Sequence, residues 1–157
     1  MTKVKDTIKV RGFFRLHITE DGRIVGDSGW HPNQVTNLGF DQFLAQTLGG
    51  MAGSKTISHV ALGTGGAPAA ADTSLAGEIM SSTQRKTVSP STIASKTVQF
   101  TAAFASSASF LTATANLSNI GLFNTSSGGT LFAGNTYASS SCATNQSVNI
   151  SYQIRFS

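Results

Sequence analysis

The glycine-rich stretch Gly63–Gly66 is the first place where the residue types suggest chemistry, because glycine loops can cradle phosphate groups. A P-loop carries a lysine and then a serine or threonine after its last glycine, whereas Ala67 and Pro68 follow here. The spacing also differs from the Gly-x-Gly-x-x-Gly pattern of dinucleotide sites. We therefore interpret this loop as scaffold whose glycines permit tight backbone turns.

The histidines and carboxylates do not form a catalytic pattern either. His17, His31 and His59 lack a neighbouring nucleophile motif or a carboxylate that would orient them. We interpret Asp72 as a helix cap and Glu78 as a helix-surface residue, which leaves no convincing acid pair for glycoside hydrolysis. We therefore expect no catalytic residues and no cofactor, and we expect that the protein is not an enzyme.

A metal site is the remaining chemical possibility. Asp21, Asp27 and Asp41 are the carboxylates that would have to form it, and no Cys or His spacing accompanies them. We therefore expect no metal. Cys142 is the single cysteine, so no intramolecular disulfide can form, as suits assembly in a reducing cytoplasm.

Basic residues crowd the N-terminal segment. The chain carries 11 Lys and Arg against 7 Asp and Glu, and no acidic residue follows Glu78. A nucleic-acid binder would carry more total charge, clustered on one face, whereas these basic residues mostly alternate along one expected strand. We therefore expect a solvated strand face or an acidic protein partner, and no nucleic acid. The candidate partner-binding residues are Lys3, Lys5, Lys9, Arg11, Phe13, Arg15 and Trp30.

The composition describes a neutral, polar surface. Charged residues make up 11% of the 157 residues, against ~25% in typical soluble domains. Ser, Thr, Ala, Gly and Asn take their place, which suits a β-rich fold partly covered by neighbouring subunits. No apolar run approaches the ~18 residues that span a bilayer, and the N-terminus does not resemble a signal peptide, so we expect no membrane partner.

Strict alternation of apolar and polar residues predicts the strands that carry the basic residues. From Ile8 to Ile18 the apolar residues Ile8, Val10, Phe14, Leu16 and Ile18 share one face, and Phe13 interrupts the other face. Residues 20–23 then form a tight turn with Asp-Gly at its centre. The same alternation predicts strands over 57–62, 97–104, 116–123, 130–137 and 148–156, and residues 89–92 are interpreted as a loop.

A change of period predicts a short amphipathic helix from Asn37 to Leu48. Asn37 would cap it, and Gly49-Gly50 would end it. Phe40, Phe43, Leu44 and Leu48 would form its apolar face. A second, brief helix is expected over residues 75–80, capped by Asp72 or Thr73.

These elements predict a mainly β protein. We expect an antiparallel β-sandwich, jelly-roll-like, with one or two short helices in the first half; the strand pattern by itself is also compatible with a barrel. Residues 1–157 would form a single β-rich domain, with residues 1–7 as a candidate flexible basic arm.

Three segments, in this order along the chain, resemble small virion proteins of tailed bacteriophages. The first, residues 27–39, matches "D-S-G-W … N-x-V-T-N-x-G". The second, residues 61–79, matches "A-L-G-T-G … D-T-x-L-x-x-E-I", although the arginine that often follows closely is Arg85 here. The third, residues 120–133, matches "I-G-L-F-N … G-G-T-L-x-A".

The resemblance implies a virion structural protein, assembled in the bacterial host cytoplasm. A capsid decoration, or cement, protein would bind the outer surface of the major capsid protein shell and stabilise it, as a homo-oligomer (dimer or trimer). The basic segment from Lys3 to Arg15 would contact an acidic capsid surface, with Trp30, Phe13 and Phe14 as apolar anchors. The alternative is a tail or tail-fibre component with an adsorption or glycan-binding role through Trp30 and Tyr137.

Overall fold

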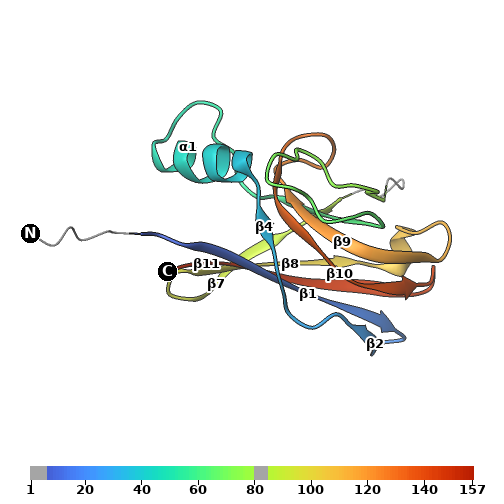
Figure 1. Ribbon diagram of the computed structural model, residues 1–157. Coiled ribbons are helices and arrows are strands. Elements are labelled where there is room, and N and C mark those ends of the chain that lie inside the picture. Colours follow the sequence, from blue (N-terminus) through green and yellow to red (C-terminus); the bar gives the residue numbers. More distant parts are fainter. Residues whose placement is uncertain (1–6, 80–84) are drawn as a thin grey trace, which may run out of the picture.

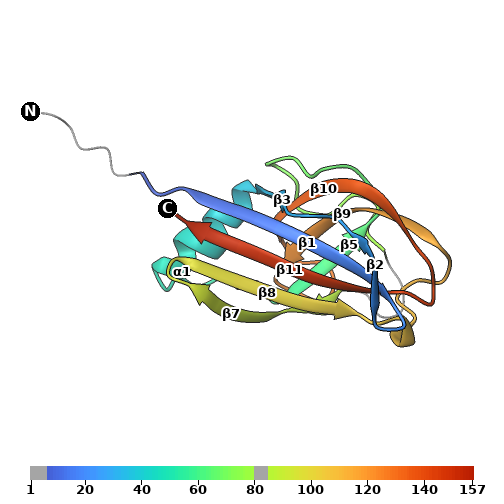
Figure 2. The ribbon, with the colours of Figure 1, turned by 90° about the horizontal axis from the view of Figure 1, so that it is seen from below.

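Two antiparallel sheets face each other in the computed structural model, which describes residues 7–79 and 85–157. Figure 1 shows the sheets as two layers, and Figure 2 looks onto one of them. This arrangement confirms the predicted antiparallel β-sandwich. Of the candidate arm, residues 1–7, only Thr7 is among the described residues.

One layer, sheet A, has the strand order β2-β1-β11-β8-β7, with β3 also paired to β1. Its strands are β1 (Val10–Glu20), β2 (Arg23–Asp27), β3 (His31–Pro32), β7 (Ser89–Ala94), β8 (Thr97–Phe104) and β11 (Ser147–Phe156). The other layer, sheet B, has the order β4-β10-β9-β5-β6. Its strands are β4 (Gln34–Val35), β5 (His59–Gly63), β6 (Lys86–Thr87), β9 (Ala115–Phe123) and β10 (Leu131–Cys142).

The connections between the layers are those of Greek-key sandwiches. β8 and β11 are neighbours in sheet A, while the hairpin β9–β10 that joins them along the chain belongs to sheet B. Such double crossings also build jelly rolls. A short 3-10 helix, η2 (Ser106–Ala108), lies on the connection from β8 to β9.

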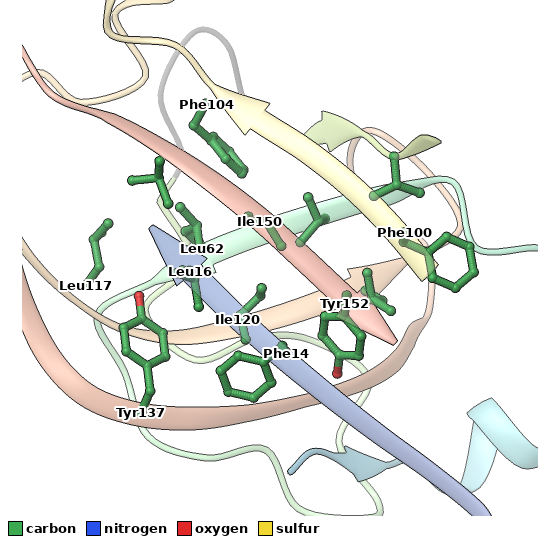
Figure 3. Close-up of a cluster of buried hydrophobic side chains, with 14 of the residues drawn as sticks. Phe14, Leu16, Leu62, Phe100, Phe104, Leu117, Ile120, Tyr137, Ile150 and Tyr152 are labelled. Carbon is green, nitrogen blue, oxygen red and sulfur yellow. The ribbon is translucent and has the colours of Figure 1, made fainter. Parts of the chain in front are cut away.

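The core forms between the sheets because β1 and β11 alternate in register. Phe14 lies opposite Tyr152 and Leu16 opposite Ile150, and all four side chains point to the same side. Figure 3 shows them together with residues of sheet B such as Ile120. Ile8, by contrast, precedes β1 and is 80% exposed, so its predicted place in the core is wrong.

The first helical segment covers residues 37–48, as the sequence predicts, but its cap is Thr36 and not Asn37. The Thr36 hydroxyl accepts the N–H of Gly39 at 2.9 Å and donates to the Leu131 carbonyl at 2.7 Å. Thr36 is fully buried, so this hydroxyl ties the start of the helix to β10.

The apolar face of that helix differs from the expected one. Its middle is a π-helix, η1 (Gly39–Ala45), which continues into a short α-helix, α1 (Gln46–Leu48). Phe43 is buried, whereas Phe40 is 46% exposed and Leu48 is 92% exposed. A π-turn holds more residues than an α-turn, so residues spaced for an α-helix do not share one face.

The second expected helix does not form within residues 75–79, and Met80 lies outside the described residues. The backbone there bonds to β5 instead: the Thr64 N–H donates to the Gly77 carbonyl and the Ile79 N–H to the Leu62 carbonyl. Asp72 caps no helix, and its carboxylate accepts the N–H of Ala69 at 2.8 Å. Residues 89–92, expected as a loop, belong to edge strand β7.

Candidate functional site

The outward face of sheet A carries three of the nominated residues. Because β1 alternates, Arg11, Phe13 and Arg15 lie on the side opposite to the core residues Phe14 and Leu16. This is the face that Figure 2 presents, with β1, β11 and β8 side by side. It is therefore open to a partner along three strands.

The register with β11 adds a cation that the sequence analysis did not nominate. Arg155 lies directly opposite Arg11, and Gln153 lies opposite Phe13. The Arg155 guanidinium is 4.7 Å from the centre of the Phe13 ring, which is a cation–π contact. It also donates to the Gln153 amide oxygen, and the Gln153 amide donates to Gln99 at 2.9 Å. These contacts explain why Phe13 is half-buried on a polar face.

Arg15 is already engaged within the molecule. Its Nε donates to the Asp27 Oδ1 at 2.9 Å and its Nη2 donates to Oδ2, so the ion pair is two-pronged. The N–H of Gly29 bonds to the same carboxylate at 2.9 Å. The hydrogen bond from Arg15, followed by that from Gly29, holds the pKa of the Asp27 carboxyl well below its usual range. Arg15 is therefore less available to a partner than Arg11.

Cations gather at the end of sheet A where β1 begins. Backbone hydrogen bonds of 2.7 and 3.0 Å join Lys9 to Ser157, and the N–H of Phe156 donates to the Lys96 carbonyl at 2.9 Å. These bonds bring the β7–β8 turn, the start of β1 and the end of β11 close together. We call this set of exposed residues the cationic end: Lys9, Arg11, Lys96 and Arg155. Lys3 and Lys5 lie outside the described residues.

The carboxylates of the described residues lie away from the cationic end or are paired. Glu20 and Asp21 lie at the β1–β2 turn, Asp41 lies in the helix and Asp72 lies in the loop after β5. Asp27 and Glu78 are each held in an ion pair. Arg11 of β1 and Arg155 of β11 are therefore directly opposite each other on adjacent strands. Neither has a salt-bridge partner among residues 7–79 and 85–157. Like charges directly opposite each other destabilise a sheet. An anionic partner would relieve that repulsion.

Trp30 is held at the edge of sheet A. The preceding segment is tied to β1, because the Ser28 N–H donates to the Leu16 carbonyl at 3.0 Å and the Ser28 hydroxyl accepts the Leu16 N–H at 2.9 Å. β3, which follows directly, pairs with β1 at Phe13. Trp30 is 45% exposed, so it is available to a partner.

Two other expected contacts are wrong. Phe14 is fully buried, because the alternation of β1 turns it into the core, where its ring packs against Tyr137 and Tyr152. Tyr137 is only 8% exposed, and burial raises the pKa of its hydroxyl. Neither residue can reach a partner, so a glycan would have to bind without Tyr137.

The glycine loop Gly63–Gly66 serves packing, in agreement with its interpretation as scaffold. A Cβ at Gly65 would lie 2.3 Å from the Ala76 carbonyl oxygen, so only glycine fits there. The buried Asn119 amide donates to the carbonyls of Gly66 and Ala76 at 3.0 and 2.8 Å. These bonds fix both arms of the loop on β9.

A buried ion pair was not foreseen. The Arg85 Nε lies 2.7 Å from the Glu78 Oε1, and the guanidinium lies 3.3 Å from the centre of the Phe123 ring. Arg85 also donates to the carbonyls of Gly128 and Thr125 at 2.6 and 3.2 Å. The expectation that Glu78 is a helix-surface residue is wrong, since its side chain is only 11% exposed. The pattern of apolar and polar residues could not predict this ion pair, because its two residues do not lie in one regular helix or strand.

The described residues contain no group of three or more His, Cys, Asp or Glu side chains that could hold a metal ion. Within the same residues, no helix is long and apolar enough to cross a membrane. In comparisons with known proteins, no family model, no curated protein and no solved structure matches this chain.

Proposed function

We propose that this chain is a structural protein of a tailed-bacteriophage virion that decorates the capsid, binding the outer surface of the major capsid protein shell and stabilising it. The cationic end carries the proposal. There Arg11 and Arg155 lie opposite each other without a carboxylate partner in the described part of the chain, which costs stability unless an acidic surface binds them.

The packing of the three phage-like segments supports the proposal. Residues 61–63 pair in β5 with β9, and residues 120–123 of β9 pair with β10. Thr36, from the first segment, bonds to the carbonyl of Leu131 in the third. The three segments that carry the resemblance therefore belong to one packed unit.

The surface chemistry suits a binding role of this kind. Long-range attraction between the cationic end and acidic capsid residues would speed encounter and set the orientation. Phe13, which Arg155 partly covers, and Trp30 at the sheet edge would supply the apolar contacts. Because only the assembled shell is bound, binding would stabilise it by mass action.

Replacing Arg155 with Glu tests the proposal and separates binding from folding. The new carboxylate would face Arg11, and this attraction would offset the loss of the Arg155 contacts with Phe13 and Gln153, so we expect the free energy of unfolding to change little. Co-sedimentation with purified capsids that lack the protein measures binding. The Arg155→Glu variant should bind at least tenfold more weakly than the wild type, and binding of the wild type should weaken as salt is added.

Lys86→Glu is the matched control, because it makes the same charge change on sheet B. Lys86 is half-buried and lies outside the proposed interface, so this variant should bind within about twofold of the wild type. Unchanged capsid binding by Arg155→Glu would contradict the proposal.

The second candidate is a tail or tail-fibre component with an adsorption or glycan-binding role. The exposed Trp30 favours it, because an indole face is a platform on which a sugar ring can stack. The burial of Tyr137 weakens it.

A further inference from the structure

An apolar pocket of about 320 Å³ opens at the helical end of the sandwich. Its lining includes side chains that also belong to the core: Phe43 of the helix, Phe132 of β10, Phe100 of β8 and Ile154 of β11 are each no more than 7% exposed. The core is therefore accessible from outside at this end. Pockets of this size with mainly apolar walls are typical of sites for small molecules.

One side of the pocket is polar. It consists of Thr47, in the last turn of the helix, and of Lys55 and Thr56, in the segment that leads to β5. The N–H of Lys55 donates to the Gln42 carbonyl at 2.9 Å, and the Thr47 hydroxyl donates to the Lys55 carbonyl at 3.3 Å. These bonds hold the segment against the helix, so the polar groups of the lining lie together.

Lys55 is the only charged side chain among the described residues that line the pocket. Its ammonium donates to the Gln42 amide oxygen at 2.7 Å. This bond uses one of the three N–H groups and brings no negative charge, because the amide is neutral. No carboxylate of residues 7–79 and 85–157 lies within salt-bridge distance of the ammonium. The half-buried Lys55 therefore keeps two donors and its full charge for an anion at the edge of an apolar surface.

The wall that the helix contributes has a rare geometry. Phe43 and Leu44, which line the pocket, belong to the π-helix η1. π-helical turns are uncommon and occur frequently at functional sites. The backbone of this wall therefore supports a binding site independently of the chemistry of the lining.

We propose that the pocket binds an aliphatic carboxylate of medium chain length, such as octanoate. The alkyl chain would lie against Phe100, Phe132 and Ile154, where burial of its methylene groups favours binding. The carboxylate would accept hydrogen bonds from the Lys55 ammonium beside Thr47 and stay partly solvated. A neutral apolar ligand would leave the ammonium without a counter-charge, and a small anion would leave the apolar walls uncovered. The proposal concerns a site other than the cationic end, so it can fail while capsid binding stands, and the reverse.

NMR chemical-shift titrations of the full chain with octanoate and with octanol test the two parts of this proposal. We expect octanoate to shift the resonances of the lining residues and to bind more tightly than octanol. Lys55→Met keeps an apolar stem but removes the charge, so octanoate binding should weaken about fivefold while octanol binding stays within about twofold of the wild type. Thr47→Trp places an indole at the pocket from an exposed position and should weaken binding of both ligands at least tenfold.

The controls are Lys86→Met and Thr114→Trp, which make the same chemical changes at positions outside this pocket. Both should bind the two ligands like the wild type, and circular dichroism should confirm that all variants fold. A wild type that does not bind octanoate, shifts confined to residues outside the pocket, or unchanged octanoate binding by Lys55→Met would overturn the proposal. Octanol binding as tight as that of octanoate would also contradict it, because the pocket would then recognise the alkyl chain alone.

Discussion

Arg85 uses its charge within the fold, in contrast to the exposed arginines of sheet A. Its side chain is 5% exposed, and its guanidinium binds Glu78, two carbonyls and the face of Phe123. The loop after β5 and the turn after β9 both depend on this one group. Arg11 and Arg155, in contrast, are exposed and have no carboxylate within salt-bridge distance among the described residues.

We predict that Arg85→Met lowers the free energy of unfolding by about 3–5 kcal/mol, because Glu78 then stays buried as an unpaired charge. Urea denaturation measures the change. Adding Glu78→Gln to the same chain should restore part of the loss. Arg15→Met, which breaks a solvent-exposed pair, should have a much smaller effect. Equal stability of Arg85→Met and the wild type would contradict this account of the pair.

The sequence predicted the position of single residues only where the alternation of apolar and polar residues along a strand showed which face they occupy. Alternation correctly placed Arg11 and Phe13 on the outward face and Phe14 on the inward face, yet Phe14 was still nominated as an anchor. The pairing of Arg15 with Asp27 and the position of Arg155 depend on strand register. Register is set by long-range packing, so local pattern does not contain it.

At the scale of elements, the helix over residues 37–48 depends on a buried hydroxyl. The Thr36 side chain both caps the helix and bonds to β10. We predict that Thr36→Val, which keeps the shape but removes both bonds, lowers the free energy of unfolding by about 1–3 kcal/mol, because it leaves buried backbone groups without partners. Chemical denaturation followed by fluorescence of Trp30 measures this change.

Asn37→Ala is the control for that experiment, since Asn37 is exposed and was the cap that the sequence indicated. It should change stability by no more than about 0.5 kcal/mol. If Asn37→Ala proved the more damaging of the two substitutions, the assignment of the cap to Thr36 would be wrong.

Element existence was more predictable than element detail. Apolar spacing and the Gly49-Gly50 pair marked both ends of the first helix, but its π-turns changed which residues are buried. The second expected helix failed because Gly77 adopts φ +62° and its carbonyl bonds to Thr64. A competing strand-like contact with β5 therefore outweighed the local helical pattern.

At the scale of the whole molecule, charge is distributed along the strands of sheet A. The cationic end lies where β1 begins, and Glu20 and Asp21 lie at its other end. Alternation and turn residues predicted an antiparallel, mainly β fold, but this pattern is common to sandwiches and barrels. The sequence did not predict the order of strands in each sheet or the apolar pocket, because both depend on how distant segments pack.

The central claim is that the chain is a structural component of a phage shell, and its copy number in purified particles tests this most directly. Quantitative mass spectrometry would give the molar ratio of this chain to the major capsid protein. We predict a ratio near one or a simple fraction of one. A trace ratio would favour the tail or tail-fibre candidate, and absence of the chain from the particle would contradict the proposed function.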